Sequence, residues 1–212
     1  MFPDVKTADK NGLLAISKEL NTDMLIQAYS KGIFPWPMND DDIIPWFSPP
    51  HRAVLFLDNF TIPKSLAKKI KKKSYSFSIN KNFSEVIRNC AKSPNRKDAT
   101  WITEKMIAAY LKLHERGYAH SIECYEDKTL VGGLYGVSIN MMFAGESMFH
   151  LKSNASKLSL CYLVEHLRER KVSWIDCQQL TPLFSKFGAI EIEREQFTMI
   201  LKDSVNTQIK LF

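Results

Sequence analysis

The stretch "AHSIECYEDKTLVGGLYGVSINMMFAGESMFH", residues 119–150, holds the pattern that decides the fold. It contains three β-rich runs, separated only by the polar residues Asp127–Lys128 and by Asn140. Runs joined by turns this short predict an antiparallel meander. Glycines at 132, 133 and 136 weaken the middle run and indicate a bulge or a close backbone approach by a ligand. They match neither GxGxxG nor a P-loop, so they predict no nucleotide site.

Helices and further strands are predicted on both sides of the meander. Apolar spacing and capping residues indicate helices over 82–93, 103–117, 153–170 and 181–188, and β-rich runs indicate strands over 74–79, 172–178 and 189–193. A meander followed by a long helix and another strand is an α+β layout, with helices flanking a mixed, largely antiparallel sheet. Acyltransferases of the GNAT type share this layout, an analogy of fold that establishes no chemistry.

The N-terminal part of the chain has a different composition. A helix is predicted within residues 11–31, with Asn21 or Thr22 as its N-cap and Gly32 at its end. Five prolines and four aromatic residues follow within residues 32–52, which predicts an aromatic loop with little regular structure. After a strand over 53–57 we place a domain boundary near Phe60. Residues 1–60 then form a small N-terminal domain, and residues 61–212 form a GNAT-like domain.

Composition limits the classes of function. The chain has 212 residues, of which 45% are hydrophobic and 25% charged, as in ordinary globular proteins. No apolar run approaches the roughly 18 residues of a membrane span, and the N-terminus does not resemble a signal peptide. The four cysteines show no CxxC pair and no metal-ligand spacing with the five histidines. This pattern favours free thiols, no bound metal and a cytoplasmic location.

Positive charge gathers in "PKSLAKKIKKKS", residues 63–74, within a chain whose formal net charge is +6. As a helix, this segment has Leu66 and Ile70 on one face and lysines over the rest. Such a surface can neutralise nucleic-acid phosphates, or it can simply keep a solvated helix soluble. The lysines concerned are Lys64, Lys68, Lys69, Lys71, Lys72 and Lys73.

Several motifs together resemble a single family. In chain order they are "NGLLAI", "YSKGIFPW", "WFSPPHRAVL", "TWIT", "AYLKLHERGYAHSIE", "LVGGLYGV", "FAGESMF", "NASK", "IDCQ" and "FGAIEI", and they run from Asn11 to about Ile192. GIFPW, GESMF and IDCQ form the most specific combination. With these motifs the chain resembles the bacterial leucyl/phenylalanyl-tRNA–protein transferases.

The resemblance implies an activity and its partners. Members of that family move leucine or phenylalanine from aminoacyl-tRNA to the N-terminal amine of proteins that begin with arginine or lysine, which marks those proteins for degradation. It implies no metal or coenzyme, no membrane partner and a monomer. It also implies a small N-terminal domain followed by a domain similar to GNAT and Fem-type peptidyl transferases.

The sequence departs from the family pattern at three places. Residues 17–20 read Ser-Lys-Glu-Leu where the family has Gly-Gly before Asp-Leu, which leaves a turn in doubt. Phe47 stands in "WFSP" where the family has a second tryptophan, so a stacking surface changes from indole to phenyl. The tail beyond the final helix is short.

Three polar residues are the candidates for catalysis. Glu146 is the carboxylate of the apolar stretch "FAGESMFH", where an ionised group is costly unless it is paired. By the resemblance we expect Glu146 to hold the α-amino group of the aminoacyl donor; alternatively it is a solvated or structurally paired residue. Gln178 and Asp176 share one face of a strand. We expect Gln178 to act in proton transfer or oxyanion binding, with Asp176 orienting it; alternatively the two only fix the end of the strand.

The binding residues follow from the substrate that the resemblance implies. An apolar pocket for the donor side chain is expected from Leu134, Phe143, Ser147, Leu160 and Leu163, although the same residues could be ordinary core. Trp101 and Phe47 are expected to stack on the terminal adenosine of tRNA, or else to pack between the domains. The lysine segment would hold the acceptor stem through its phosphates.

Two other functions remain open at this point. An acetyl-CoA-dependent acetyltransferase of the GNAT type needs a pyrophosphate-binding loop, of which "HLKSNASK" is a poor version. A non-catalytic RNA-binding protein leaves Glu146, Asp176 and Gln178 without a role. A triad of Ser147, His150 and Asp176 lacks the GxSxG turn that presents such a serine.

Overall fold

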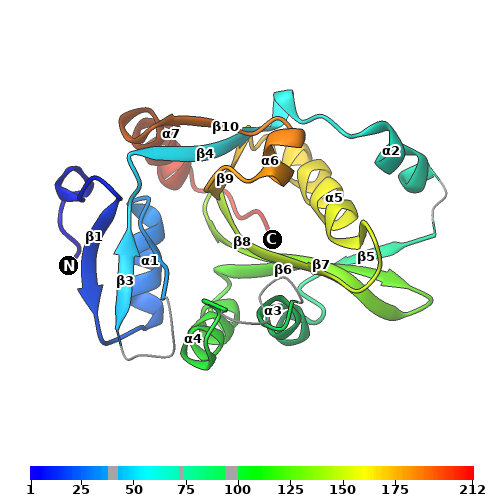
Figure 1. Cartoon of the computed structure of the whole chain (residues 1–212), viewed down its shortest axis with the longest axis horizontal. Coiled ribbons are helices and arrows are strands. Elements are labelled where there is room, and N and C mark those ends of the chain that lie inside the picture. Colours follow the sequence, from blue (N-terminus) through cyan, green and yellow to red (C-terminus); the bar gives the residue numbers. More distant parts are fainter. Residues whose placement is uncertain (38–42, 72–73, 94–99) are drawn as a thin grey trace.

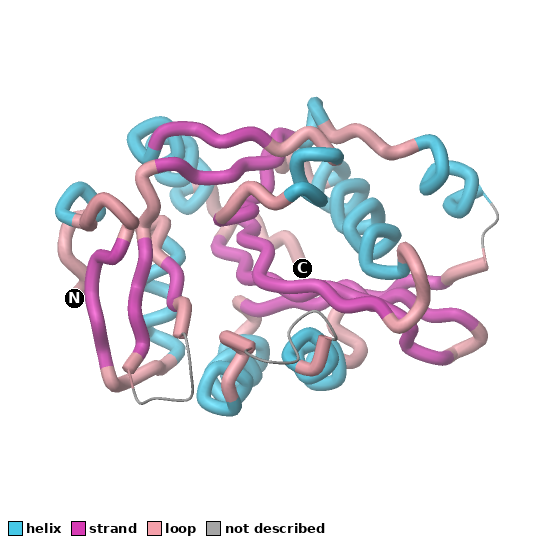
Figure 2. Tube along the Cα trace, in the orientation of Figure 1, coloured by secondary structure: helices cyan, strands magenta, loops and turns pink. Residues whose placement is uncertain are grey.

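The computed structural model describes residues 1–37, 43–71, 74–93 and 100–212. These residues form a 3-stranded sheet of order β1-β3-β2 and a 7-stranded sheet of order β10-β4-β9-β8-β7-β6-β5 (Figure 1, Figure 2). The small sheet contains β1 (Leu13–Ser17), β2 (Phe34–Pro35) and β3 (Ile44–Phe47). The large sheet contains β4 (His51–Phe56), β5 (Ser76–Ile79), β6 (Ala119–Glu126), β7 (Thr129–Ile139), β8 (Met142–His150), β9 (Trp174–Gln178) and β10 (Ile190–Glu193).

The predicted meander is confirmed. Strands β6, β7 and β8 pair antiparallel in succession. Beyond them β8 lies parallel to β9, where Ala144 is aligned with Asp176. The sheet is therefore mixed and largely antiparallel, and the predicted α+β class is confirmed.

Helices cover both faces of the large sheet. Helix α5 (Ala155–Glu169) packs against β6 and β7 on one face, and α3 (Phe83–Ala91) and α4 (Glu104–Glu115) cover the other (Figure 1). Alternate strand residues therefore face two separate apolar cores. Among the described residues, no helix is long and apolar enough to cross a membrane. The remaining helical segments are η1 (Val5–Thr7), α1 (Thr22–Ser30), η2 (Leu57–Asn59), α2 (Lys64–Lys71), α6 (Pro182–Lys186) and α7 (Arg194–Asn206).

The start and end of α1 follow the predicted signals. The Asn21 side chain accepts a hydrogen bond from the Met24 N–H, as an N-cap does. The helix ends at Ser30, and Gly32 follows its C-cap Lys31 with a φ of +75°. A Cβ at this position would lie 2.7 Å from a ring carbon of Phe197. Glycine is therefore needed here for its conformation and for the close approach of α7.

Short parts of the proline-rich segment form strands, and for those parts the prediction of an aromatic loop was wrong. Strand β3 pairs with both β1 and β2. Pro35 lies in β2, an edge strand, where a missing N–H breaks no ladder. Pro45 contributes only its carbonyl, which accepts from the Trp36 N–H at 2.9 Å. Residues 38–42 of the segment lie outside the described part of the chain.

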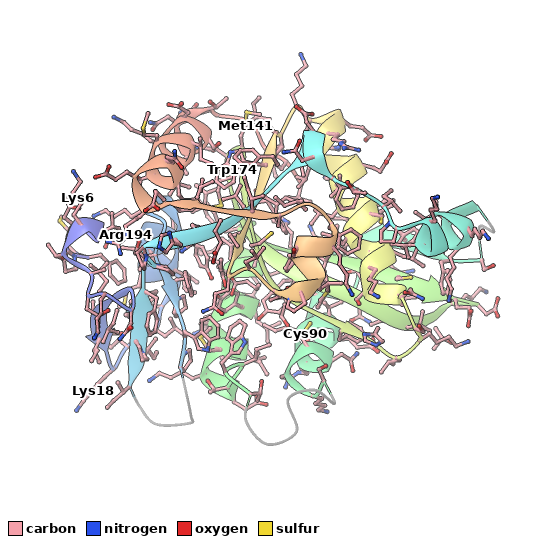
Figure 3. All side chains as sticks on the ribbon, turned by 45° about the horizontal axis from the view of Figure 1, so that its top comes forward. Lys6, Lys18, Cys90, Met141, Trp174 and Arg194 are labelled. Atoms are coloured by element: carbon pink, nitrogen blue, oxygen red, sulfur yellow. The ribbon has the colours of Figure 1, made fainter. Side chains whose placement is uncertain are left out.

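Strand β4 connects the two sheets in the chain. It pairs with β9 on one side and β10 on the other, so residues 51–56 belong to the large sheet. The two-domain division stays a prediction, and this pairing favours a boundary near residue 50 rather than near Phe60. Arg194, labelled in Figure 3, joins the same region: its Nη1 donates to the Val5 carbonyl at 2.8 Å and its Nε to the Pro49 carbonyl at 3.1 Å.

Candidate active site

Glu146 lies in a β-bulge of β8. Tyr135 pairs with Ser147, whereas the next residue, Gly136, pairs with Gly145, so Glu146 is the extra residue on its strand. A bulge bends the strand and re-aims the side chain of the extra residue. A Cβ on Gly136 would lie 2.3 Å from a carbonyl oxygen of β8, so this glycine lets the two strands approach. Of the two predicted reasons for the glycines, the bulge applies here.

Three side chains from three other elements donate hydrogen bonds to the Glu146 carboxylate. The Tyr29 hydroxyl on α1 and Gln178 Nε2 on β9 both donate to Oε1, at 2.6 and 2.7 Å. The Tyr110 hydroxyl on α4 donates to Oε2 at 3.2 Å. An ionised carboxylate offers about four acceptor positions. The described side chains use three of them, which leaves one position on Oε2 for a further donor.

Burial has a large effect on the charge of the Glu146 carboxyl group. It raises the pKa of Glu146 from 4.5 to about 7, although the hydrogen bonds from the two tyrosines and Gln178 act in the opposite direction. Burial also raises the pKa of Tyr29 and of Tyr110 well above 10, so both hydroxyls keep their protons at neutral pH. Glu146 therefore changes its charge near neutral pH, as functional carboxyl groups often do.

Asp176 is held by a buried arginine. Arg52 on β4 donates from Nε and Nη2 to the two carboxylate oxygens of Asp176, at 2.8 and 2.7 Å, and the two residues are only 1% and 2% exposed. Asp176 Oδ1 also accepts from the backbone N–H of Gln178 at 2.9 Å. The predicted partnership of Asp176 with Gln178 therefore runs through the backbone of Gln178, while the side-chain amide of Gln178 contacts Glu146.

Gln178 has an unusual backbone conformation. Its φ is +60°, in the left-handed region that non-glycine residues rarely adopt. Such strain persists only where surrounding contacts impose it, and it clusters at functional sites. The hydrogen bond to Asp176 is one contact that imposes it here.

A cavity of about 360 Å³ opens beside Glu146 and Gln178. This volume lies at the lower end of the roughly 300–1,000 Å³ that small-molecule sites occupy. The structure brings together around it all five residues predicted for the donor pocket, namely Leu134, Phe143, Ser147, Leu160 and Leu163. Most of the other lining side chains are apolar and include Pro35, Trp36, Trp101, Ile175, Leu183 and Phe184.

The two aromatic residues predicted to stack on adenosine lie in different places. Trp101 lines the cavity together with Trp36, and their ring centroids are 6.3 Å apart at an interplanar angle of 45°. Phe47 is not among the described residues that line the cavity. It lies on β3, with its ring centroid 6.3 Å from that of Phe34. The tryptophan pair, rather than Phe47, offers an aromatic surface beside Glu146.

The lysine segment lies apart from this cavity. Helix α2 is at the opposite end of the molecule from the small sheet (Figure 1), and it lines no part of the cavity among the described residues. Lys64 and Lys68 are exposed, and Lys69 borders a second cavity of about 290 Å³. Lys71 ends the helix, and Lys72 and Lys73 lie outside the described residues.

Other reactive groups are placed unfavourably for chemistry. The Asp176 carboxylate binds Arg52 rather than His150, which is exposed at the end of β8, so the triad does not form. Cys177 lines the cavity, but burial raises the pKa of its thiol, which therefore stays protonated. Within the described residues, no group of three or more His, Cys, Asp and Glu side chains is placed to hold a metal ion.

Sequence reasoning missed three residues of this site. Tyr29 and Tyr110 occupy apolar faces of their helices, so their spacing indicated only core packing. Arg52 stands one position before the apolar run of β4. A charged residue at the start of a buried strand was its only signal, and that signal is too common to be specific.

Comparison with known proteins identifies the family. The family model "Leucyl/phenylalanyl-tRNA protein transferase" matches residues 54–202, and the model of the N-terminal domain of these proteins matches residues 18–50. The chain is 45% identical to the leucyl/phenylalanyl-tRNA–protein transferase of Lawsonia intracellularis, over 97% of this chain and 90% of that one. It is 47% identical to that of Nitrosospira multiformis, over 97% and 89%. Among solved structures it is similar to that of L-PGS from Bacillus licheniformis, with a TM-score of 0.43 and 13% identity over 80% of this chain and 54% of that one.

These matches and the site define an aminoacyltransferase, an enzyme that passes an aminoacyl group from tRNA to a protein. The chain belongs to the leucyl/phenylalanyl-tRNA–protein transferase family. The resemblance found in the sequence is confirmed, and the family decides against the acetyl-CoA and non-catalytic RNA-binding alternatives.

Proposed function

We propose that the protein transfers leucine or phenylalanine from aminoacyl-tRNA to the N-terminal amine of proteins that begin with arginine or lysine, which marks those proteins for degradation. The observation that carries the proposal is the Glu146 carboxylate at the wall of an apolar cavity, with one acceptor position left on Oε2. A carboxylate complements the α-ammonium group of an aminoacyl donor. The apolar cavity beside it complements a leucine or phenylalanine side chain.

The reaction needs positioning more than activation. The acceptor amine attacks the ester carbonyl carbon, a C–N bond forms, the bond to the ribose oxygen of tRNA breaks, and an amine proton passes to that oxygen. Holding the reactants together can contribute roughly 7–11 kcal/mol. Gln178 Nε2 uses one N–H for Glu146, and its second N–H can donate to the oxyanion, a contribution of about 3–4 kcal/mol.

The tRNA end is assigned to the aromatic side of the cavity. We place the terminal adenosine on Trp101 and its neighbour Trp36, which lie beside the donor pocket, instead of on Phe47. Such a stack contributes about 1–3 kcal/mol per base. We keep the lysines of α2 as the contact with the acceptor stem, since phosphate binding needs no groove that reads bases.

A transfer assay tests the proposed function. The protein is incubated with labelled leucyl-tRNA and a peptide that begins with arginine, and separately with labelled acetyl-CoA and the same peptide. We expect label in the peptide only with the tRNA donor, and none in a control peptide that begins with alanine. Transfer of acetyl, or equal transfer to both peptides, would contradict the proposal.

Location and assembly are proposed on the same basis. We propose that the protein acts in the cytoplasm, because its four cysteines are buried thiols, as in proteins of reducing compartments. We propose that it acts as a monomer. Sedimentation at assay concentration checks this, and a dimeric mass would overturn it.

The size of the donor pocket can be tested at Leu163, which lines the cavity and is 1% exposed. We expect Leu163→Phe to lower kcat/KM for phenylalanyl-tRNA about 10-fold more than for leucyl-tRNA, because the added ring removes space that the larger donor needs. Leu167→Phe, on the same helix but away from the cavity lining, is the matched control. Equal losses for both donors would show that Leu163 acts only through packing.

The role of the α2 lysines can be tested through salt dependence. We expect replacement of Lys64, Lys68 and Lys69 by glutamine to raise KM for tRNA and to reduce the slope of log(kcat/KM) against log(salt) by up to about one per lysine. The control removes the same charge from the other end of the molecule, with exposed Lys6, Lys10 and Lys202 replaced by glutamine. An unchanged slope in the α2 variant would assign tRNA binding to another surface.

A further inference from the structure

Arg52 connects two of the three residues that hold Glu146. Its guanidinium binds Asp176, and Asp176 in turn holds the backbone N–H of Gln178. Nη1 of Arg52 donates to the carbonyl of Gly32 at 3.2 Å, just after the end of α1, which carries Tyr29. Tyr29 and Gln178 are the two residues that donate to the same oxygen of Glu146, Oε1.

The guanidinium itself is fixed from both sides. The rings of Phe34 and Phe197 lie on its two faces, each with its centroid 4.6 Å from the Arg52 Cζ. Phe34 belongs to β2 and Phe197 to α7, so three elements besides β4 (β2, β9 and α7) and the turn after α1 meet at this side chain. Because Arg52 is 1% exposed and lines no part of the cavity among the described residues, it has no direct route to a substrate.

Stability alone is a poor reason for this arrangement. A buried ion pair gains little over a well-packed apolar pair, because both charges must leave water. The charged pair instead fixes the orientation of its partners. Nε and Nη2 of the planar guanidinium hold the Asp176 carboxylate, and Nη1 holds the Gly32 carbonyl just after α1. Arg52 thereby contacts, directly or through Asp176, the two segments that carry Tyr29 and Gln178, whose side chains both donate to Glu146.

We propose that Arg52 is a positioning residue for the aminoacyl donor, which sets the two hydrogen bonds that Tyr29 and Gln178 make to Oε1 of Glu146. The inference rests on the proposed role of Glu146 in holding the donor α-amino group. Loss of the guanidinium fork lets Gln178 leave its left-handed conformation and lets α1 shift, so both donors move away from Oε1.

The test compares Arg52→Lys with Arg194→Lys. Arg194 is a partly buried arginine near the same junction, and among the described residues its guanidinium donates to the Val5 and Pro49 carbonyls. Each variant is measured for its unfolding temperature, for kcat and KM with leucyl-tRNA, and for the titration of Glu146 by NMR of ¹³C-labelled glutamate carboxyl groups. The Glu146 signal is identified by its absence in Glu146→Gln.

We expect Arg52→Lys to lower kcat/KM for the donor about 10- to 100-fold, as misplacement of a substrate by about 1 Å does, with KM for the acceptor peptide unchanged. We also expect the pKa of Glu146 to rise above about 7, because the hydrogen bonds that oppose the effect of burial weaken. Arg194→Lys should leave both quantities at the wild-type value.

Two results would overturn the proposal. One is a wild-type Glu146 titration and donor kcat/KM in Arg52→Lys; the other is equal losses in Arg194→Lys at equal loss of stability. If Arg52→Lys unfolds at the assay temperature, all three proteins are measured in sucrose, which favours the compact state. The titration needs no substrate, so it tests the positioning even if Glu146→Gln keeps full transfer activity and the proposed function fails.

Discussion

Glu146→Gln should remove most of the transfer activity while the protein stays folded. The glutamine keeps the size of the side chain but has no charge to bind the α-ammonium of the donor. Removing one partner of a buried charged contact typically costs about 2–5 kcal/mol. We therefore expect kcat/KM for leucyl-tRNA to fall about 100- to 1,000-fold. KM for the acceptor peptide should change little.

The control for this variant is Glu169→Gln. Glu169 is exposed on α5 and, within the described part of the chain, forms an ion pair with its neighbour Arg170 at 3.6 Å, so the change removes the same charge away from the cavity. Transfer by this control should equal that of the wild type. Wild-type transfer by Glu146→Gln, with leucyl-tRNA at concentrations below KM, would show that the α-amino group binds elsewhere.

The fold could be predicted where it follows from local pattern. The meander, the α1 cap at Asn21 and the stop at Gly32 all depend on residues within a few positions of each other. The small sheet could not be predicted, because β1 pairs with β3 across the intervening helix α1, and β2 has only two residues. The prolines also argued against strands here, but β3 can pair through the carbonyl of Pro45 although this residue has no N–H.

The candidate site shows the same division. The apolar lining was predicted from β7, β8 and α5, which are adjacent in sequence and in space. The tyrosines were missed because a buried tyrosine and a hydrogen-bonding tyrosine give the same helical pattern. Arg52 was missed because its partners, Asp176 and Gly32, are distant in sequence and meet only through pairing of β4 with β9 and the packing of α1.

The hydroxyls around Glu146 indicate which protonation state the unliganded site prefers. Tyr29 and Tyr110 contact each other at 2.5 Å, and each also contacts the Glu146 carboxylate. Each of these three hydrogen bonds needs one proton, and the two tyrosine hydroxyls supply only two. An ionised Glu146 accepts from both tyrosines, which leaves no proton for the contact between Tyr29 and Tyr110. Protonation of Glu146 reverses the contact at Oε2: Oε2–H then donates to Tyr110, Tyr110 donates to Tyr29, and Tyr29 donates to Oε1. This count agrees with the pKa of Glu146, which burial raises to about 7.

The raised pKa gives stability a definite dependence on pH. Between pH 4.5 and about 7 the folded protein keeps a proton on Glu146 that the unfolded chain has released. The contribution of Glu146 to folding is therefore greatest below pH 4.5, falls as pH rises to about 7, and is constant above it. The loss across this window is at most about 3 kcal/mol. His120, whose pKa burial lowers to about 4, changes stability in the opposite direction over part of the same range.

Comparison with Glu146→Gln isolates the contribution of Glu146, because His120 and the other titrating groups are common to both proteins. The glutamine mimics the protonated carboxyl: its amide N–H can donate to Tyr110 while its oxygen accepts from Tyr29 and Gln178. We expect the two proteins to unfold at the same urea concentration at pH 4.5, and the variant to be more stable by about 2–3 kcal/mol at pH 8. The free energy of unfolding in urea at several pH values measures this difference.

A constant difference from pH 4.5 to 8 would mean that Glu146 is already ionised at low pH. The three-proton arrangement would then be wrong, because the close contact between the tyrosines would have to persist without the proton from Glu146.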